Sequence, residues 1–61
     1  MKPTGWLKGA SIVQGHAQGR IYGDTRNRWA DGTVIRTSRI LSGPDSIGVI
    51  RTLNSFYVLQ P

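Results

Sequence analysis

Hydrophobic residues recur along this chain in short runs of β-branched and aromatic side chains, separated by polar segments rich in Gly and Pro. This pattern is typical of short strands joined by tight turns, and no stretch keeps the 3.6-residue period of an amphipathic helix. We therefore expect an all-β fold. Five strands are predicted, at 6–13, 20–22 with an extension to 24, 33–41, 47–53 and 56–60.

Turn residues mark the limits of these strands. Asp31-Gly32 is a strong turn signal because both residues tolerate a positive φ angle. The segment 42–46, with its Gly-Pro-Asp sequence, ends the third strand. Gly9 interrupts the first strand and indicates a bulge or a bend. The polar segment 14–19 predicts a flexible loop, and residues 1–5 are expected to form an N-terminal tail.

The last two strands are predicted to form a hairpin with a two-residue turn at Asn54-Ser55. This turn would pair Leu53 with Phe56, and Arg51 with Val58. One face would then carry Ile50, Thr52, Tyr57 and Leu59, and the other face would carry Val49, Arg51, Leu53, Phe56 and Val58. Apolar residues on both faces favour a strongly curved sheet, or a second face that meets a partner.

The length of 61 residues leaves room for a single small β domain, residues 1–61. Five short strands fit a small five-stranded SH3-like barrel. An OB fold normally needs more residues and often a helix. The alternative to the barrel is a strongly curved antiparallel meander. Because there is no Cys, stability must come from an aromatic core or from self-association.

Positive charge dominates the composition. Eight Lys and Arg stand against three Asp and no Glu, and the formal net charge is +5. An excess of this size and sign suggests a polyanionic partner, DNA or RNA. Six of the eight cations are Arg, whose planar guanidinium suits bidentate contact with phosphate.

The Arg residues form two groups along the chain. Arg20, Arg26 and Arg28 bracket Tyr22 and precede Trp29, and basic residues interleaved with aromatic ones are typical of single-stranded nucleic-acid binding. If Leu41 pairs with Ile47, then Arg39 opposes Val49 and Thr37 opposes Arg51, so that Arg39 and Arg51 share a face. The candidate nucleic-acid-binding residues are therefore Arg20, Arg26, Arg28, Trp29, Arg39 and Arg51, with Trp29 or Tyr22 as the stacking ring.

Other interpretations remain open for these residues. Trp6, Trp29, Tyr22 and Tyr57 are of the kind that fills the core of so small a domain. The Arg residues equally suit a surface that contacts an acidic protein, or simple solubility. Arg36 is expected on the face opposite to Arg39 and Arg51, which divides the strand charges.

Catalytic chemistry is not indicated. Acid–base catalysis usually needs two positioned titratable groups, whereas His16 lies in a Gly-flanked segment and the three Asp residues are scattered. The segment 15–19 lacks the Lys-Ser/Thr ending of a P-loop. Asp31 and Asp45 are expected to form turns, and Asp24 to do the same or to pair with Arg26 or Arg28. We expect a protein that is not an enzyme, with no metal and no cofactor.

The second half of the chain resembles short β-proteins of phages and other bacterial mobile elements. The resemblance rests on the Asp-Gly-Thr-Val-Ile-Arg-Thr-Ser stretch at 31–38 and on the hydrophobic Thr-Leu-Asn-Ser-Phe-Tyr ending at 52–57. It implies a phage-type protein inside a bacterial host cell. It also implies a second type of role, in which the protein binds and modulates a host protein.

The sequence contains no secretory signal and no apolar run long enough to span a membrane, and it predicts a cytoplasmic protein. The leading hypothesis is a small basic binding module that contacts nucleic-acid phosphates through Arg side chains. The alternatives are a protein-interaction module that contacts an acidic host protein, and a homo-oligomeric structural component.

Overall fold

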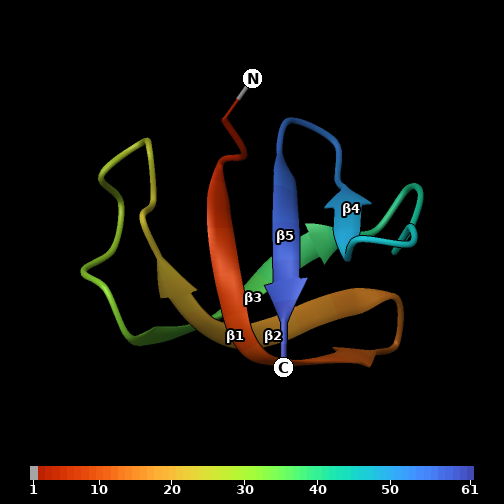
Figure 1. The fold of residues 1–61 in the computed structure, drawn as a ribbon, viewed down its shortest axis with the longest axis horizontal. Helices are drawn as coiled ribbons and strands as arrows, with labels where there is room; N and C mark the ends of the chain where they lie inside the picture. Colours follow the sequence, from red (N-terminus) through yellow and green to blue (C-terminus); the bar gives the residue numbers. More distant parts are fainter. Residues whose placement is uncertain (1) are drawn as a thin grey trace.

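The computed structural model describes residues 2–61, which form one strongly curved sheet of five strands (Figure 1). Within this part of the chain there is no helix, so the predicted all-β fold is confirmed. The strands are β1 (Gly5–Val13), β2 (His16–Tyr22), β3 (Thr33–Arg39), β4 (Val49–Arg51) and β5 (Phe56–Gln60).

The strands are arranged in the order β3-β2-β1-β5-β4. Neighbouring strands are antiparallel except β1 and β5, which run parallel and side by side in Figure 1. In a chain of five strands that alternate in direction, the first and the last point the same way, so the two are parallel once the curved sheet makes them neighbours. The sheet is therefore mixed, and its one parallel pair departs from the alternative prediction of a strongly curved antiparallel meander.

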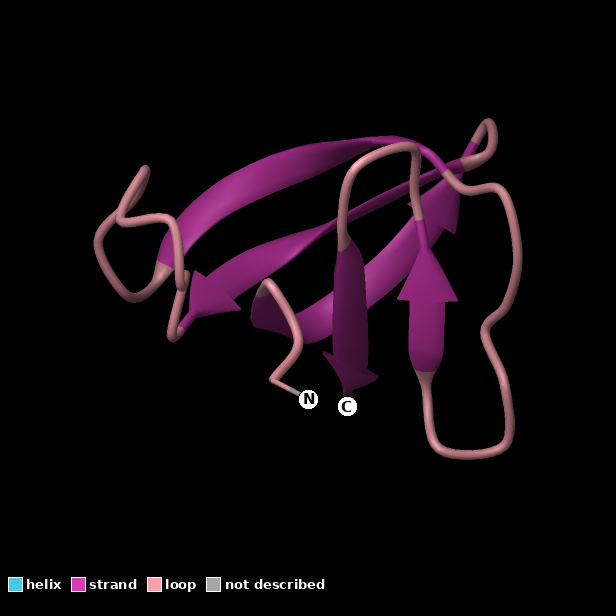
Figure 2. Cartoon of the chain, turned by 90° about the horizontal axis from the view of Figure 1, so that it is seen from above, coloured by secondary structure: helices cyan, strands magenta, loops and turns pink. Residues whose placement is uncertain are grey.

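The predicted barrel is not closed. Closure would require β3 and β4 to pair along their length, in the predicted register with Leu41 opposite Ile47. Instead, the chain beyond β3 forms an isolated bridge with β4, between Ser42 and Arg51, together with a few backbone hydrogen bonds to Arg51 and Val49. Figure 2 shows the long connection that carries the chain from β3 to β4. Arg39 consequently pairs with His16 on β2, and it does not lie opposite Val49.

A small core fills the concave side of the sheet. Side chains from every strand contribute to it, and they occupy alternate positions because neighbouring residues of a strand point to opposite faces. Trp29, Ala10, Ile40 and Leu59 pack against its edge. The buried apolar residues are Leu7, Ala17, Ile21, Ile35, Ile50 and Tyr57.

The first strand contains the bulge that its glycine predicted. The register between β1 and β2 shifts between Lys8 and Ser11, and Gly9 has a φ angle of +63°. Glycine adopts this conformation without steric cost. The bulge bends β1, which lets one strand pair with β2 along its length and with β5 at its start.

The predicted loop at 14–19 is wrong. Gln14 and Gly15 alone form the turn, both with positive φ angles of 52° and 79°, and Val13 pairs with His16. Two consecutive positive φ angles are the geometry of a type I′ hairpin turn. Ala17 and Gly19 then occupy buried positions of β2. They are too small to register as hydrophobic in the sequence, so the two-residue period of this strand was hidden.

The hairpin of β4 and β5 has a longer turn than predicted. The Thr52 amide donates to the Ser55 carbonyl at 2.9 Å, and Arg51 pairs with Phe56. Every partner is thus displaced by two residues from the predicted register. A displacement of two keeps each side chain on its face. Ile50 and Tyr57 are accordingly buried together, as the predicted faces required.

The expected N-terminal tail is part of the sheet from Thr4 onward. Gly5 is the first residue of β1, and the Thr4 side chain is buried. The Thr4 amide donates to the Phe56 carbonyl at 2.8 Å, and the Thr25 amide donates to the Thr4 carbonyl at 2.9 Å. This segment therefore ties the start of β5 to the connection between β2 and β3.

Candidate nucleic-acid interface

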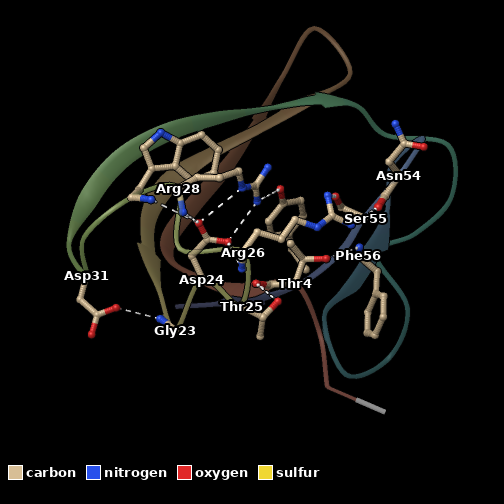
Figure 3. Close-up of polar contacts among 12 residues, drawn as sticks. Thr4, Gly23, Asp24, Thr25, Arg26, Arg28, Asp31, Asn54, Ser55 and Phe56 are labelled. Atoms are coloured by element: carbon tan, nitrogen blue, oxygen red, sulfur yellow. Dashed lines mark hydrogen bonds and ion pairs between the residues drawn. The ribbon is translucent and has the colours of Figure 1, made fainter.

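The connection between β2 and β3 is built around the buried carboxylate of Asp24. Its Oδ2 accepts hydrogen bonds from the backbone amides of Arg28 at 2.7 Å and Trp29 at 3.2 Å, and Oδ1 accepts one from the amide of Arg26 at 3.3 Å. Figure 3 shows these contacts converging on the carboxylate. Asp24 thereby determines the path of the segment that carries three of the candidate site residues.

Asp24 also forms an ion pair with Arg28, whose NH2 lies 3.2 Å from Oδ1. Burial by itself would raise the pKa of the Asp24 carboxyl, but the hydrogen bonds from Arg28 and Arg26 outweigh it and lower the pKa below the ordinary value. The carboxylate is therefore ionised at neutral pH. The prediction that Asp24 bonds backbone amides or pairs with a nearby Arg is confirmed in both parts.

The side chains of Arg28 and Trp29 contact other residues of the protein. The guanidinium of Arg28 donates to Asp24 and to the Tyr57 hydroxyl at 3.2 Å. It also lies over the Trp29 ring, 4.2 Å from the centroid. Trp29 packs against the edge of the core. Both residues are thus engaged with the protein, which favours a structural role over direct contact with a ligand.

Arg26 extends from the same connection to the loop between β4 and β5. Its NH1 donates to the Ser55 hydroxyl at 2.9 Å, and its NH2 donates to the Asn54 carbonyl. Figure 3 shows the side chain spanning from the Asp24 region to these two residues. A guanidinium has five N–H donors. These bonds use two, so three remain on a side chain that is exposed and held in place.

A groove of about 540 Å³ lies beside Arg26, where four segments of the chain meet. Its wall contains three cations, and no Asp or Glu is found among the described residues that line it. The basic residues are Lys2, Arg26 and Arg51; the other lining residues are Thr4, Thr25, Leu41, Thr52, Leu53, Asn54, Ser55 and Phe56.

The groove combines charge with one aromatic ring. Phe56 begins β5 and pairs with Arg51 across the hairpin. The Arg51 guanidinium carbon lies 5.8 Å from the centre of the Phe56 ring. Phe56 is half-buried and does not belong to the core, and Figure 3 shows its ring directed away from the Asp24 cluster. The groove therefore offers an aromatic side chain beside cationic ones.

The remaining candidate residues lie outside this groove. Arg20 is exposed on β2 and donates to the Gly32 carbonyl at 3.0 Å. Arg39 is exposed at the end of β3, with its guanidinium close to Gly15. Tyr22, the alternative stacking ring, is about one-third exposed on β2. The fold thus unites Arg26 with Arg51, one residue from each predicted group, and separates both from Arg20 and Arg39.

The other titratable residues form local contacts. The Asp31 carboxylate accepts from the Gly23 amide at 2.8 Å, and Asp45 accepts from the amides of Ile47 and Val49 at 3.0 and 2.9 Å. The predicted turn role is confirmed for Asp45, whereas Asp31 lies in a turn and bonds the far end of the connection between β2 and β3. His16 begins β2, and its Nδ1 lies 2.9 Å from the Thr37 carbonyl. Residues 2–61 contain no group of three side chains that could together hold a metal ion.

Sequence reasoning missed Lys2 and Phe56 as members of the groove. Lys2 was assigned to a tail, and only the fold brings it to the loop between β4 and β5. Phe56 had a usable signal, because the predicted hairpin already placed it on the same face as Arg51. The prediction describes both faces of this hairpin as partly apolar and assigns the ring no role beside the neighbouring cation.

Residues 2–61 include no helix with the length and hydropathy that crossing a membrane requires. Comparison of the chain with protein-family models, with curated proteins and with solved structures finds no match.

Proposed function

We propose that this protein is a non-enzymatic module that binds nucleic acid through the groove lined by Lys2, Arg26 and Arg51. The observation that carries the proposal is the concentration of three cations in one groove whose described lining contains no carboxylate. A polyanion gains attraction from all three charges there and meets no opposing one.

The state of Arg26 supports phosphate as the ligand. Its contacts with Asn54 and Ser55 hold the guanidinium in one orientation and leave three donors free. A side chain that is already ordered loses less entropy when it binds. Guanidinium groups bind phosphate oxygens through paired N–H donors. We propose Arg26 and Arg51 as phosphate contacts, with Arg20 and Arg39 outside the site and Arg28 supporting it.

A fluorescence anisotropy titration with labelled DNA and RNA oligonucleotides tests this function. We expect binding at about 50 mM salt that weakens as salt increases, because bound phosphates release counterions. Substituting Lys2, Arg26 and Arg51 together by Gln should reduce the log–log salt slope by about 2 to 3 units if each cation contacts one phosphate.

A second triple variant provides the control. Lys8, Arg20 and Arg39 are exposed and lie outside the groove, and their substitution by Gln lowers the net charge from +5 to +2, as in the groove variant. We expect this control to retain most of the affinity. Equal losses in both variants would attribute binding to diffuse charge and would reject the groove, and no binding at 50 mM salt would reject the function.

Two exposed leucines favour a protein ligand as the second candidate function. Leu41 and Leu53 line the same groove and are 60% and 74% exposed. Large apolar side chains that remain exposed often contribute to protein interfaces. A host protein that is retained from nuclease-treated bacterial lysate by the wild type, and not by Leu53→Ser, would favour this candidate.

A further inference from the structure

We infer that the groove accepts an unstacked base between the Phe56 ring and the Arg51 guanidinium, and that the protein therefore selects single-stranded over double-stranded nucleic acid. This inference rests on the proposed nucleic-acid binding and deepens it. It identifies the stacking ring as Phe56, in place of Trp29 or Tyr22.

The position of Phe56 is the first argument. The ring is half-buried, it is absent from the core, and it faces a groove with three cations. Its backbone is anchored on both sides by Thr4, which donates to the Phe56 carbonyl at 2.8 Å and accepts from the Phe56 amide at 3.3 Å through Oγ1. A large aromatic ring that the core does not use, on a fixed backbone, is suited to stacking.

The spacing between Arg51 and Phe56 is the second argument. Planar groups stack at about 3.4 Å, the rise between bases along a strand, so a base held between two planes needs them about 7 Å apart. The Arg51 carbon lies 5.8 Å from the ring centre, which is wider than direct stacking. Arg51 is exposed, so its side chain can move outward from the ring to admit a base.

The neighbouring cations supply the third argument. Arg26 and Lys2 line the same groove as the ring, so the phosphates that flank a stacked base would meet positive charge. In a duplex each base is stacked and paired with its neighbours, and exposing its face costs unpairing energy. A single strand presents base faces without that cost, which is why the arrangement favours single strands.

Anisotropy titrations with three ligands test the inference: a single strand, its duplex, and a strand of the same length with abasic sites in place of bases. Wild-type protein should bind the single strand about 10-fold more tightly than either of the other two, since all three carry phosphates and only the first offers free base faces. This comparison requires no variant.

Variants then locate the stacking ring. Phe56→Leu keeps an apolar side chain and removes the π face, and it should weaken single-strand binding by about 10-fold and leave abasic-strand binding unchanged. Phe56→Tyr keeps the ring and should retain affinity. Arg51→Lys keeps the charge without the planar group, and it should weaken binding of the base-containing strand more than binding of the abasic strand.

The outcomes separate this inference from the proposed function. Equal affinity for the normal and abasic strands, or an unchanged single-strand affinity in Phe56→Leu, would overturn base stacking and leave phosphate binding intact. A duplex bound as tightly as the single strand would overturn the selectivity. Failure to bind any of the three ligands would reject both proposals.

Discussion

Asp24 is the residue on which the geometry of the basic loop depends. One buried carboxylate accepts hydrogen bonds from the backbone amides of Arg26, Arg28 and Trp29. It also pairs with the guanidinium of Arg28, which donates to the Tyr57 hydroxyl. Arg26 leaves this loop in the direction of the groove because its own amide is fixed there. A charged group with almost no exposure is stable only when it is fully hydrogen-bonded, and this condition is met here.

Asp24→Asn should lower the free energy of unfolding by about 2 to 4 kcal/mol. The substitution leaves Arg28 without its charge partner, and it places the NH2 group of Asn against backbone N–H groups that need an acceptor. Urea-induced unfolding followed by Trp fluorescence measures the effect. Asp31→Asn is the matched control, since Asp31 is exposed and accepts a single backbone bond. Comparable losses in the two variants would contradict the central role of Asp24.

The same carboxylate makes stability depend on pH. The pKa of Asp24 is lower in the folded protein than its ordinary value of 3.8. At pH values between these two pKa values, the unfolded state therefore binds more protons than the folded state. The stabilisation is therefore complete above the ordinary pKa and is lost as the pH falls through the folded pKa. The free energy of unfolding should decline more steeply with acid in the wild type than in Asp24→Asn.

At the scale of elements, turns and small residues decide where strands begin. The predicted strand at 56–60 matches β5, and the turn at Asp31-Gly32 precedes β3 as expected. The sequence underestimated β2 because its inner positions are Ala17 and Gly19. It overestimated β4, since the ladder with β5 covers only Val49–Arg51. Pattern reasoning detects large side chains in alternation, and it fails where the inward positions are small.

Substitutions at Gly9 and Gly48 distinguish the cost of an unfavourable φ angle from the cost of a steric clash. Gly9 and Gly48 have φ angles of +63° and +86°; a Cβ at Gly9 would meet no atom within 4 Å, whereas one at Gly48 would lie 2.6 Å from the Leu59 carbonyl oxygen. Gly9→Ala should cost about 1 kcal/mol from conformation alone. Gly48→Ala should cost about 3 kcal/mol, because the junction with β5 must also move.

The midpoints of urea unfolding for these two variants check the prediction. Gly48 also accepts a hydrogen bond from the Leu59 amide at 2.7 Å, so a displaced backbone there disturbs the end of β5. A variant of Gly9 that is as destabilised as the variant of Gly48 would mean that the bulge in β1 is more constrained than its open surroundings indicate.

The whole molecule is held together by contacts between its two ends. Thr4 joins β5 to the loop of Asp24, and the parallel pair of β1 and β5 joins the two halves of the sheet (Figure 1). These contacts also assemble the groove, whose cations come from the N-terminal segment, the connection between β2 and β3, and β4. The site therefore exists only when all three segments are in place.

Truncation tests this dependence. A chain that lacks residues 1–4 should lose about 2 to 3 kcal/mol of unfolding free energy, because Thr4 forms hydrogen bonds worth roughly 1 kcal/mol each with Phe56 and Thr25. A chain that lacks residues 1–2 keeps those bonds and should retain its stability, but it should bind nucleic acid more weakly because Lys2 is gone. Thermal unfolding monitored by circular dichroism distinguishes the two chains.

The fold class, the faces of the final hairpin and the turn roles of Asp24 and Asp45 follow from local pattern, since strand alternation and turn chemistry act over a few neighbouring residues. The composition of the groove does not follow from it. Lys2, Arg26 and Arg51 are distant in the sequence, and their meeting depends on a parallel pairing and on a four-residue turn that shifts the hairpin register by two. Local pattern carries no information on such contacts, because they are determined by how the completed sheet curves back on itself.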